Sequence, residues 1–294
     1  MRDTGNEGLV LKNYGGFYYI QDEEDKIIAC RLRGKVKTQV LSGDRVYFTK
    51  LSDDTGILEK VLPRDNELIR PRIANVSLVL IVMSYDKPAP SLYLLDRLLF
   101  LAFYHQLKPV ILLNKCDLIP ENKVLFIQEY YLRAGFDLIH TSAVKKQGLE
   151  EVRTIIKDNI AVFAGPSGAG KSSLLNALLE GVNMKTQEVS NKIGRGRHTT
   201  RHVELFPLST GGFLADTPGF SVVSMPQIER QKLAHFFPDF LPFISECRFR
   251  DCIHFKEESC GVQKAQSSGL IAESRYENYL SMLQEVIENE RCYR

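Results

Sequence analysis

One stretch of the chain has the residue types and spacing needed to hold phosphate groups. Residues 165–172 read GPSGAGKS and fit the pattern G-x-x-x-x-G-K-[ST]. They lie between an apolar run, IAVFA, and a helix-forming run, SSLLNALLE, which is the context that this motif requires. Glycines let backbone N–H groups turn toward phosphate oxygens. The predicted binding residues are Gly165, Pro166, Ser167, Gly168, Ala169, Gly170, Lys171, Ser172 and the adjacent Ser173.

Two side chains of this motif have separate tasks. Lys171 is expected to neutralise β- and γ-phosphate oxygens, and the hydroxyl of Ser172 is expected to ligate Mg²⁺. A plain glycine turn is the alternative interpretation of the same residues. The strand before the motif and the helix after it favour a phosphate site.

Residues 114–117 read NKCD and end the apolar run PVILL, where the ligand loops of an open α/β sheet lie. The carboxylate of Asp117 can accept hydrogen bonds from N1–H and the exocyclic amine of guanine, while Lys115 covers the ring. Asn114 belongs to the same predicted site. A solvated turn is the alternative, but the phosphate motif makes a guanine site the better interpretation. Ser142 and Ala143, in TSA at the end of FDLIH, supply the backbone N–H expected at guanine O6.

A third loop, DTPG at residues 216–219, follows the strand-like run GGFLA. Asp216 is expected to hold the Mg²⁺ shell through water, and the Gly219 N–H to reach the γ-phosphate. Between this loop and the phosphate motif, residues 194–202 read GRGRHTTRH, which is typical of a mobile switch. Thr199 and Thr200 are both candidates for a second hydroxyl ligand of Mg²⁺ that is ordered only with the γ-phosphate. The sequence does not decide between them, and Thr200 is taken as the working choice.

A separate cluster has the residue types of a metal site. Cys247, Cys252, His254 and Cys260 fall within 14 residues and provide three thiolates and an imidazole. Four such ligands suffice for a closed, tetrahedral, structural Zn²⁺ site. The spacing differs from the common zinc-finger pattern, so free buried cysteines are the alternative. Arg248 and Arg250 flank the ligands together with Phe249 and Phe255, which are interpreted as the small core of a zinc module rather than an RNA surface.

Three segments are expected to position these residues. Five short strand-like runs within residues 7–62, separated by turns such as Ser-Gly-Asp, predict a small β-barrel. Residues 73–223 alternate apolar strands with helices, such as 92–106 and 171–179, which predicts a parallel sheet covered by helices on both faces. The remainder is predicted to be mainly helical, with a last helix at 272–291. The predicted domains are residues 1–66, 67–225 and 226–294.

Bulk composition limits the class of protein. The chain has 294 residues, of which 44% are hydrophobic and 25% charged, as in a globular protein. The apolar runs are shorter than the roughly 20 residues of a membrane span and no secretory signal is visible, so no membrane partner and a cytoplasmic location are expected. The net charge is only +2, but basic residues gather in the barrel segment, at Arg31, Arg33, Lys35, Lys37, Arg45 and Lys50. Without the other motifs this would be a solvated face.

The motifs NKCD, TSA, GPSGAGKS, HTT and DTPG, in this order, resemble the circularly permuted GTPases of the RsgA (YjeQ) type, which assemble the small ribosomal subunit. The resemblance covers the whole chain. It implies a multidomain protein with an N-terminal OB-fold β-barrel, a central circularly permuted α/β P-loop GTPase domain and a C-terminal, mainly helical, zinc-binding domain. It also implies a monomer that binds GTP or GDP and the small ribosomal subunit with its rRNA, and that hydrolyses GTP late in subunit maturation.

The group that positions the attacking water departs from a common pattern. Many GTPases orient the attacking water with a glutamine just after the D-x-x-G glycine, whereas this chain has Phe220 there. The resemblance implies that His198 is the catalytic residue, and a switch histidine that faces phosphate or RNA is the alternative. An RNA-binding placeholder, ordered by GTP without useful turnover, is the competing hypothesis for the whole protein. A P-loop kinase or ATPase is a third, against which Asp117 argues.

Overall fold

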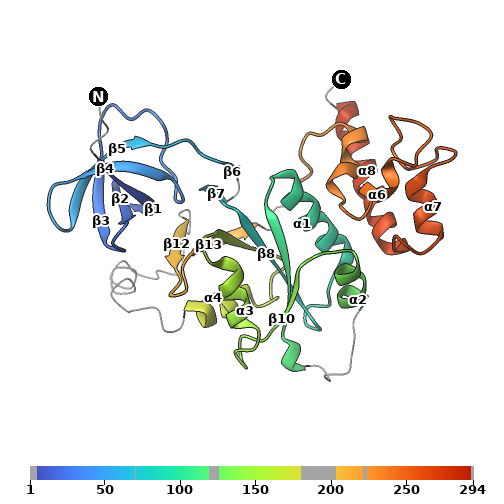
Figure 1. Ribbon diagram of the computed structural model, residues 1–294, viewed down its shortest axis with the longest axis horizontal. Helices are drawn as coiled ribbons and strands as arrows, with labels where there is room; N and C mark the ends of the chain where they lie inside the picture. The colour runs from blue at the N-terminus through green and yellow to red at the C-terminus, as the bar shows by residue number, and fades with distance from the viewer. Residues whose placement is uncertain (1–4, 70, 119–125, 180–202, 221–223, 293–294) are drawn as a thin grey trace. The chain divides into compact units, whose positions relative to one another are not determined.

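The computed structural model describes residues 5–69, 71–118, 126–179, 203–220 and 224–292, and Figure 1 traces the chain. Two compact units can be distinguished, and each is described by itself. The first contains Met1–Leu80, Ala143–Ala164 and Lys171–Ser221, and the second contains Ile81–Ser142, Gly165–Gly170 and Val222–Arg294. No helix among the described residues has both the length and the hydrophobicity needed to cross a membrane.

The first unit begins with a closed β-barrel, drawn in blue in Figure 1. Its strands are β1 (Asn6–Tyr14), β2 (Phe17–Asp22), β3 (Ile27–Leu32), β4 (Arg45–Lys50) and β5 (Thr55–Val61), in the order β1-β2-β3-β5-β4. Only β3 and β5 pair in parallel within this barrel. Alternate side chains fill the interior, among them Ile20, Ile28 and Phe48. The predicted five-stranded barrel is confirmed.

Cys30 lies inside the barrel core and is fully buried. This burial raises the pKa of its thiol to about 12. A thiol that stays protonated in an apolar core acts as a small hydrophobic residue, as expected for a cysteine outside the metal cluster. A short hairpin of β6 (Glu67–Ile69) and β7 (Arg72–Ala74), which the sequence did not predict, follows the barrel in the chain.

Six strands form a second sheet in the order β10-β9-β8-β11-β13-β12. They are β8 (Leu78–Ser84), β9 (Lys108–Asn114), β10 (Leu138–Thr141), β11 (Ile160–Ala164), β12 (Glu204–Pro207) and β13 (Phe213–Phe220). The pairs β9–β10 and β11–β13 are parallel, as predicted. All side chains of β8 and β11 are buried, which is typical of strands covered on both faces.

The edge strand β12 departs from the predicted all-parallel sheet, because it pairs antiparallel with β13. A tight turn joins the two strands, and in it Gly211 and Gly212 have φ angles of +92° and +79°. Antiparallel strands can be joined by such a short hairpin, whereas parallel strands need a long crossover. The sequence interpretation placed too much weight on the strand and helix alternation and overlooked this pair of glycines.

Helices of the α/β region are α1 (Leu92–Tyr104), α2 (Phe126–Arg133), α3 (Leu149–Ile156) and α4 (Lys171–Leu179). The predicted helices at 92–106 and 171–179 therefore exist with nearly the predicted limits. Helix α1 begins where it does because the Ser91 side chain accepts a hydrogen bond from the Leu94 backbone N–H, which satisfies one of the unpaired N–H groups of the first turn.

The second unit ends in short helical elements and one long helix. They are η2 (Arg230–Phe236), α6 (Leu241–Ile244), α7 (Gly261–Ser267) and α8 (Glu273–Cys292), close to the helix predicted at 272–291. Phe237, Phe240 and Tyr279 are all completely buried, and their rings pack with centroids 5.0–5.2 Å apart. This aromatic cluster gives the C-terminal region a core of its own.

Arg275 of α8 is a buried charge that connects α8 with α1. Its side chain is 1% exposed and forms ion pairs of 2.6 Å with Asp96 of α1 and 2.9 Å with Asp239. The hydroxyl of Tyr130 donates to Asp239 as well, at 2.9 Å. Removing one partner of such a pair leaves a buried charge without compensation. The network therefore holds α8 against α1 within this unit.

Asp239→Asn is expected to lower the free energy of unfolding at pH 7 by about 3 kcal/mol, because the Arg275 charge loses a partner. Burial alone would raise the pKa of Asp239, but the charge and hydrogen bonds of Arg275 hold it below its ordinary value of 3.8. The carboxylate thus stabilises the fold above pH 3.8 and loses this effect as the pH falls through its lowered pKa. Urea denaturation followed by circular dichroism should show the difference from the wild type shrinking below that pH.

The matched control is Asp137→Asn, which removes an exposed carboxylate paired with Lys108 at 2.7 Å. Exposed pairs contribute at most about 1 kcal/mol, so this variant should unfold nearly as the wild type does. Equal stability of Asp239→Asn and Asp137→Asn at pH 7 would contradict the assigned importance of the buried pair.

Candidate functional site

The loop between β11 and α4 has a backbone that glycine makes possible. Gly165, Gly168 and Gly170 have φ angles of +126°, +79° and +99°, which other residues rarely adopt. A Cβ atom on Gly165 would overlap the carbonyl oxygen of Val82, and one on Gly170 would overlap the side-chain amide of Asn114. The strand, loop and helix predicted around residues 165–172 are therefore present, with the N-terminus of α4 available to an anion.

Asn114, the last residue of β9, connects two of the predicted loops. Its side chain is 2% exposed. The amide nitrogen Nδ2 donates to the carbonyl oxygen of Ala169 at 2.8 Å, and Oδ1 accepts from the Thr141 hydroxyl at 3.3 Å. A buried amide with a donor and an acceptor both satisfied is fixed in one orientation. Asn114 thus acts as a structural clamp between the NKCD loop and the phosphate loop.

Lys115 extends the connection. Its φ angle is +64°, and its ammonium group donates to the carbonyl oxygens of Gly168, at 2.8 Å, and of Lys87. Asp117 follows in the short helix η1 (Cys116–Leu118) and has an exposed side chain. The aliphatic stem of Lys115 is thereby held beside the phosphate loop, with the Asp117 carboxylate left accessible to a ligand.

The TSA loop begins at the end of β10, which pairs with β9 so that Thr141 is the register partner of Asn114. Thr141 and Ser142 are completely buried, and Ala143 is partly exposed. Since the two strands are parallel, the loops that follow them leave the same edge of the sheet. The structure thus aligns the starts of the two loops that were predicted to read guanine.

Most of the remaining predicted nucleotide residues are described by the structure, and three are not. Ser167, Ser172, Ser173 and Asp216 have exposed side chains, Pro166 is partly exposed, and Gly219 lies in β13. Lys171 is partly buried, and this burial lowers the pKa of its ammonium group. His198, Thr199 and Thr200 lie outside the described residues. The exposed group can reach a ligand in solution, so its placement is compatible with phosphate and Mg²⁺ chemistry.

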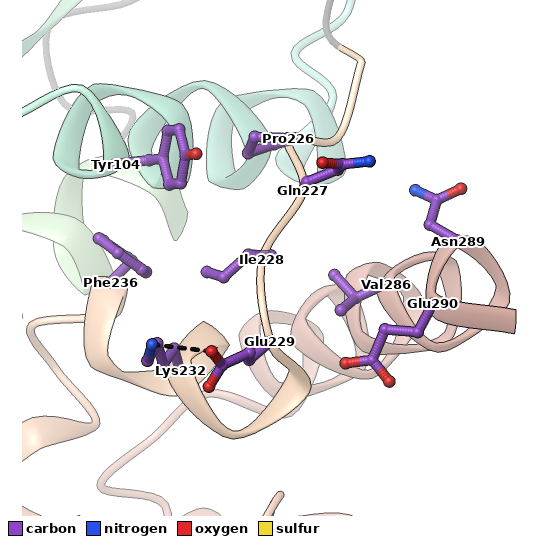
Figure 2. Close-up of a pocket in the computed structure, with 10 residues that line it drawn as sticks. All are labelled: Tyr104, Pro226, Gln227, Ile228, Glu229, Lys232, Phe236, Val286, Asn289 and Glu290. Carbon is purple, nitrogen blue, oxygen red and sulfur yellow. Dashed lines mark hydrogen bonds and ion pairs between the residues drawn. The ribbon is translucent and has the colours of Figure 1, made fainter. Parts of the chain in front are cut away.

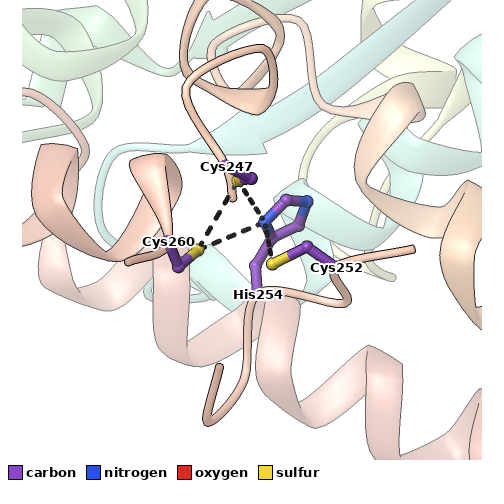
Figure 3. A group of neighbouring side chains, drawn as sticks. All are labelled: Cys247, Cys252, His254 and Cys260. Carbon is purple, nitrogen blue, oxygen red and sulfur yellow. Dashed lines mark hydrogen bonds between the residues drawn. The ribbon is translucent and has the colours of Figure 1, made fainter. Parts of the chain in front are cut away.

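The four predicted metal ligands lie together in the second unit, as Figure 3 shows. Nδ1 of His254 is 3.5 Å from Sγ of Cys247, 3.4 Å from that of Cys252 and 3.3 Å from that of Cys260. A tetrahedral zinc ion with Zn–S bonds of about 2.3 Å and Zn–N bonds of about 2.0 Å separates such ligand atoms by roughly 3.5–3.8 Å. The cluster therefore fits one metal ion with four protein ligands.

Backbone N–H groups donate hydrogen bonds to two of the predicted sulfur ligands. Cys260 is the N-cap of α7, and its sulfur accepts from the Gln263 backbone N–H at 3.5 Å. The sulfur of Cys247 accepts from the Gly261 N–H at 3.3 Å. Burial raises the pKa of Cys252 to about 12 and lowers the pKa of His254. Without a cation the Cys252 thiol therefore stays protonated, so metal binding must release its proton.

The interpretation of Phe249 and Phe255 as a small apolar core is wrong. Each side chain is 45% exposed, and the C-terminal core consists instead of the buried ring cluster around Phe237. Arg248 lies over the ring of Phe249, 5.5 Å from its centroid, and Lys256 lies 4.9 Å from that of Phe255. The aromatic side chains of this loop therefore lie at the surface, each beside a cation.

The second unit also contains a cavity of about 480 Å³ between α1, η2 and α8 (Figure 2). Its lining includes Tyr104, Ile228, Phe236 and Val286, with Glu229 and Glu290 among the polar groups. None of its lining residues belongs to the predicted nucleotide or metal sites. The cavity is therefore distinct from the loops that carry the candidate chemistry.

Sequence reasoning missed one segment at this edge of the sheet. Residues 85–88 directly follow β8, and both Tyr85 and Lys87 bond to the NKCD loop. The signal was a tyrosine at the end of an otherwise aliphatic strand, with no motif around it. Only the fold brings it beside the two predicted base-reading loops.

The barrel, the P-loop and the occurrence of NKCD before it in the chain together define a circularly permuted P-loop protein. A family model described as RsgA GTPase matches residues 61–226, and one described as RsgA N-terminal domain matches residues 7–58. The chain belongs to the RsgA GTPase family and is thus a GTP-hydrolysing enzyme. The resemblance inferred from the motifs is confirmed.

Two relatives are named small ribosomal subunit biogenesis GTPase RsgA. The chain is 45% identical to the protein of Moorella thermoacetica, covering 98% of this chain and 99% of the relative. It is 46% identical to the protein of Carboxydothermus hydrogenoformans, covering 97% and 99%. Among solved structures, YjeQ from Thermotoga maritima is 36% identical with a TM-score of 0.83 over 96% of this chain and 98% of that one. YloQ, described as a circularly permuted GTPase, is 38% identical with the same TM-score over 97% and 96%.

Asp117→Asn is expected to weaken GTP binding about 100-fold, because an amide offers the guanine amine a donor where two charge-assisted hydrogen bonds are needed. Binding of xanthosine triphosphate should become tighter, since xanthine carries an oxygen at that position. Equilibrium titration with both nucleotides measures the change. The control is Asp137→Asn, which lies just before β10, at the end of this strand away from the TSA loop. Unchanged GTP affinity in Asp117→Asn would remove the Asp117 carboxylate from the site.

The metal cluster predicts about one Zn²⁺ per chain in protein purified without chelators. Cys252→Ser should lose the metal and unfold the helices around the cluster before the barrel, as metal analysis and circular dichroism would show. Cys116→Ser leaves all four ligands in place and should keep the metal. Metal-free wild-type protein would refute the assignment.

Proposed function

We propose that this GTPase acts in the biogenesis of the small ribosomal subunit and that the subunit stimulates its GTP hydrolysis. The single observation that supports this most is identity of 45–46% with relatives of that name across nearly the whole length of both chains. The closed barrel and the metal cluster add two candidate RNA-contacting modules to the GTPase. A monomer in the cytoplasm, with domains at residues 1–66, 67–225 and 226–294, belongs to the same proposal.

In the proposed nucleotide site, different residues bind the phosphates, the base and the magnesium ion. The loop from Gly165 to Ser173 surrounds the phosphates, with Lys171 on the β- and γ-oxygens, and Asp117 selects guanine with help from the backbone of Ser142 and Ala143. Magnesium is held by Ser172 and Thr200, with Asp216 acting through water. This division follows the general chemistry of P-loop GTPases. The alignment of β9 and β10 and the clamp at Asn114 support it.

Zinc is the metal proposed for the cluster of Cys247, Cys252, His254 and Cys260. Three thiolates and one imidazole at tetrahedral spacing suit Zn²⁺, and a fully protein-ligated ion leaves no open position for catalysis. Its role would then be to stabilise the loops between α6 and α7. The hydroxyls of Tyr276 and Tyr279 in α8 donate to the carbonyl oxygens of His254 and Ile253, which supports a structural role.

Two contacts within the first unit offer a route from the barrel to the switch segment at residues 194–202. Lys12 of β1 pairs with Glu204 of β12 at 2.7 Å, and the Ser42 hydroxyl donates to the carbonyl oxygen of Val203 at 2.7 Å. Strand β12 follows that segment directly in the sequence. RNA bound to the barrel could therefore shift residues 203 and 204, which follow the proposed catalytic residue His198 in the chain.

Several basic residues of the barrel are paired with carboxylates, so less of their positive charge is free than the sequence indicated. Arg33, Arg45 and Lys50 pair with Glu59, Asp65 and Asp22, respectively. Arg31 lies over the ring of Phe17, 5.0 Å from its centroid. Cations next to aromatic rings suit the stacking and phosphate contacts of RNA, so the proposed rRNA contact rests on these rings as well as on charge.

GTP turnover with and without purified small subunits tests the proposal. Phe220 stands where many GTPases place a water-orienting glutamine, so hydrolysis by the isolated protein should be slow and should rise at least tenfold with the subunit. His198→Ala should lose most of this stimulation but retain GTP-dependent binding to the subunit. His202→Ala, which removes the other histidine of the same segment, is the matched control.

Three outcomes decide between the alternatives. Equal stimulation of wild type and His198→Ala would exclude His198 as the catalytic group while keeping the subunit as partner. Absence of stimulation in every protein would reject subunit-dependent hydrolysis. Equal loss in His198→Ala and His202→Ala would indicate a general role of the segment in RNA contact rather than in catalysis.

A further inference from the structure

The segment after β8 contacts the NKCD loop by its backbone at two places. The Tyr85 N–H donates to the carbonyl oxygen of Asn114 at 3.1 Å. The carbonyl oxygen of Lys87 accepts a hydrogen bond from the ammonium group of Lys115. Since Lys115 also donates to Gly168, its side chain is held between this segment and the phosphate loop. The NKCD loop is therefore linked by hydrogen bonds both to the segment after β8 and to the phosphate loop.

The side chain of Tyr85 connects to the other base-reading loop. Its hydroxyl is hydrogen bonded to Nδ1 of His140, and the two rings stack at 23° with centroids 5.8 Å apart. Tyr85 is 7% exposed, and burial, with a smaller effect of Cys116, raises its pKa to about 12. The hydroxyl therefore stays protonated and is hydrogen bonded to the imidazole as a neutral group. His140 lies in β10 directly before Thr141, and Ser142 follows the end of this strand.

One residue thus bonds to both loops that are expected to read guanine. Packing alone does not explain this arrangement, because a phenylalanine would fill the same space and stack on His140 equally well. The hydroxyl adds a directional bond between partly buried polar groups, and such bonds fix orientation as well as contributing energy. Small displacements of groups that read a base change discrimination strongly, since hydrogen bonds weaken steeply with angle.

We propose that Tyr85, through the Asn114 carbonyl and His140, is a positioning residue that sets the guanine selectivity of this GTPase. The inference rests on the nucleotide site assigned under the proposed function. Tyr85 keeps the loops after β9 and β10 at the separation that suits one guanine ring, whereas phosphate binding depends on the loop after β11. Its loss should therefore weaken binding of a guanine nucleotide more than binding of an adenine nucleotide.

The test measures dissociation constants for GDP and ADP by equilibrium titration, with competition against GDP for the weaker ligand. Tyr85→Phe should weaken GDP binding about tenfold and leave ADP binding within twofold, which lowers the selectivity ratio at least fivefold. Tyr104→Phe, in the cavity lining of the same unit (Figure 2), is the matched control and should keep the wild-type ratio. Thermal unfolding of each variant shows whether it is folded.

The histidine partner makes the test independent of a single substitution. His140→Leu should lower selectivity as much as Tyr85→Phe, and the double variant should lose no more than either alone, because both remove the same bond. His140→Gln keeps an acceptor for the hydroxyl and should restore most of the selectivity. Additive losses in the double variant would overturn the proposed pair.

Asp117→Asn distinguishes failure of this inference from failure of the nucleotide site. If Asp117→Asn weakens GDP binding but Tyr85→Phe keeps the wild-type selectivity ratio, the positioning role of Tyr85 is rejected and the site stands. If neither variant alters GDP binding, the assignment of the base site is itself rejected. Equal weakening of GDP and ADP by Tyr85→Phe would mean that Tyr85 supports the fold or the phosphate loop and not the base.

Discussion

The hydrogen bond from the buried Asn114 amide to the carbonyl oxygen of Ala169 holds together two loops that lie 55 residues apart in the sequence. Its geometry requires a close approach, and Gly170 permits this because any Cβ there would overlap the amide. Thr141 satisfies the other end of the same side chain. The order of the loops along the chain is irrelevant to this contact. A sheet whose parallel strands end at one edge therefore tolerates rearrangement of its sequence order.

The second unit relies on buried charge as well as on apolar packing. Arg275 is surrounded by two carboxylates and lies 4.6 Å from the centroid of the Phe237 ring. A leucine cluster could bury similar area, but it would accept many relative orientations of α1 and α8. The ion pairs accept few, because each requires its own direction and distance. A metal ion bound by Cys247, Cys252, His254 and Cys260 would order the neighbouring loops in a similar manner, because its ligands have fixed angles.

Sequence reasoning succeeded where chemistry is encoded in short, local patterns. The phosphate loop needs glycines at fixed positions, and three cysteines and a histidine within 14 residues can come together locally, so the loop and the side-chain cluster could both be recognised from residue types alone. The barrel was predictable because its five strands alternate and are separated by turns. The same reasoning could not assign a threonine to Mg²⁺, since Thr199 and Thr200 are adjacent and chemically equal.

Errors arose where the outcome depends on distant residues. Phe249 and Phe255 are apolar, yet the core of this region consists of Phe237, Phe240 and Tyr279, and the side chains of Phe249 and Phe255 lie at the surface. Strand β12 is antiparallel because of a turn whose role becomes evident only when its partner strand is known. Tyr85 and His140 are 55 residues apart, and neither belongs to a motif, so their contact becomes evident only in the folded structure.

The order of strands also has a consequence for the growing polypeptide. β8 lies between β9 and β11 in the finished sheet, and all of its side chains are buried. During synthesis β8 is followed by β9 and β10, and only then by β11. The last residue of β11 is added roughly 80 residues after the last residue of β8, which takes about 4–16 s at ~5–20 residues per second. For that interval one hydrophobic edge of β8 has no neighbour, and an unpaired edge of this kind invites aggregation. Because the gene order is permuted, the phosphate loop is synthesised late. The nascent chain therefore spends a longer period in which this edge of β8 must be protected from aggregation.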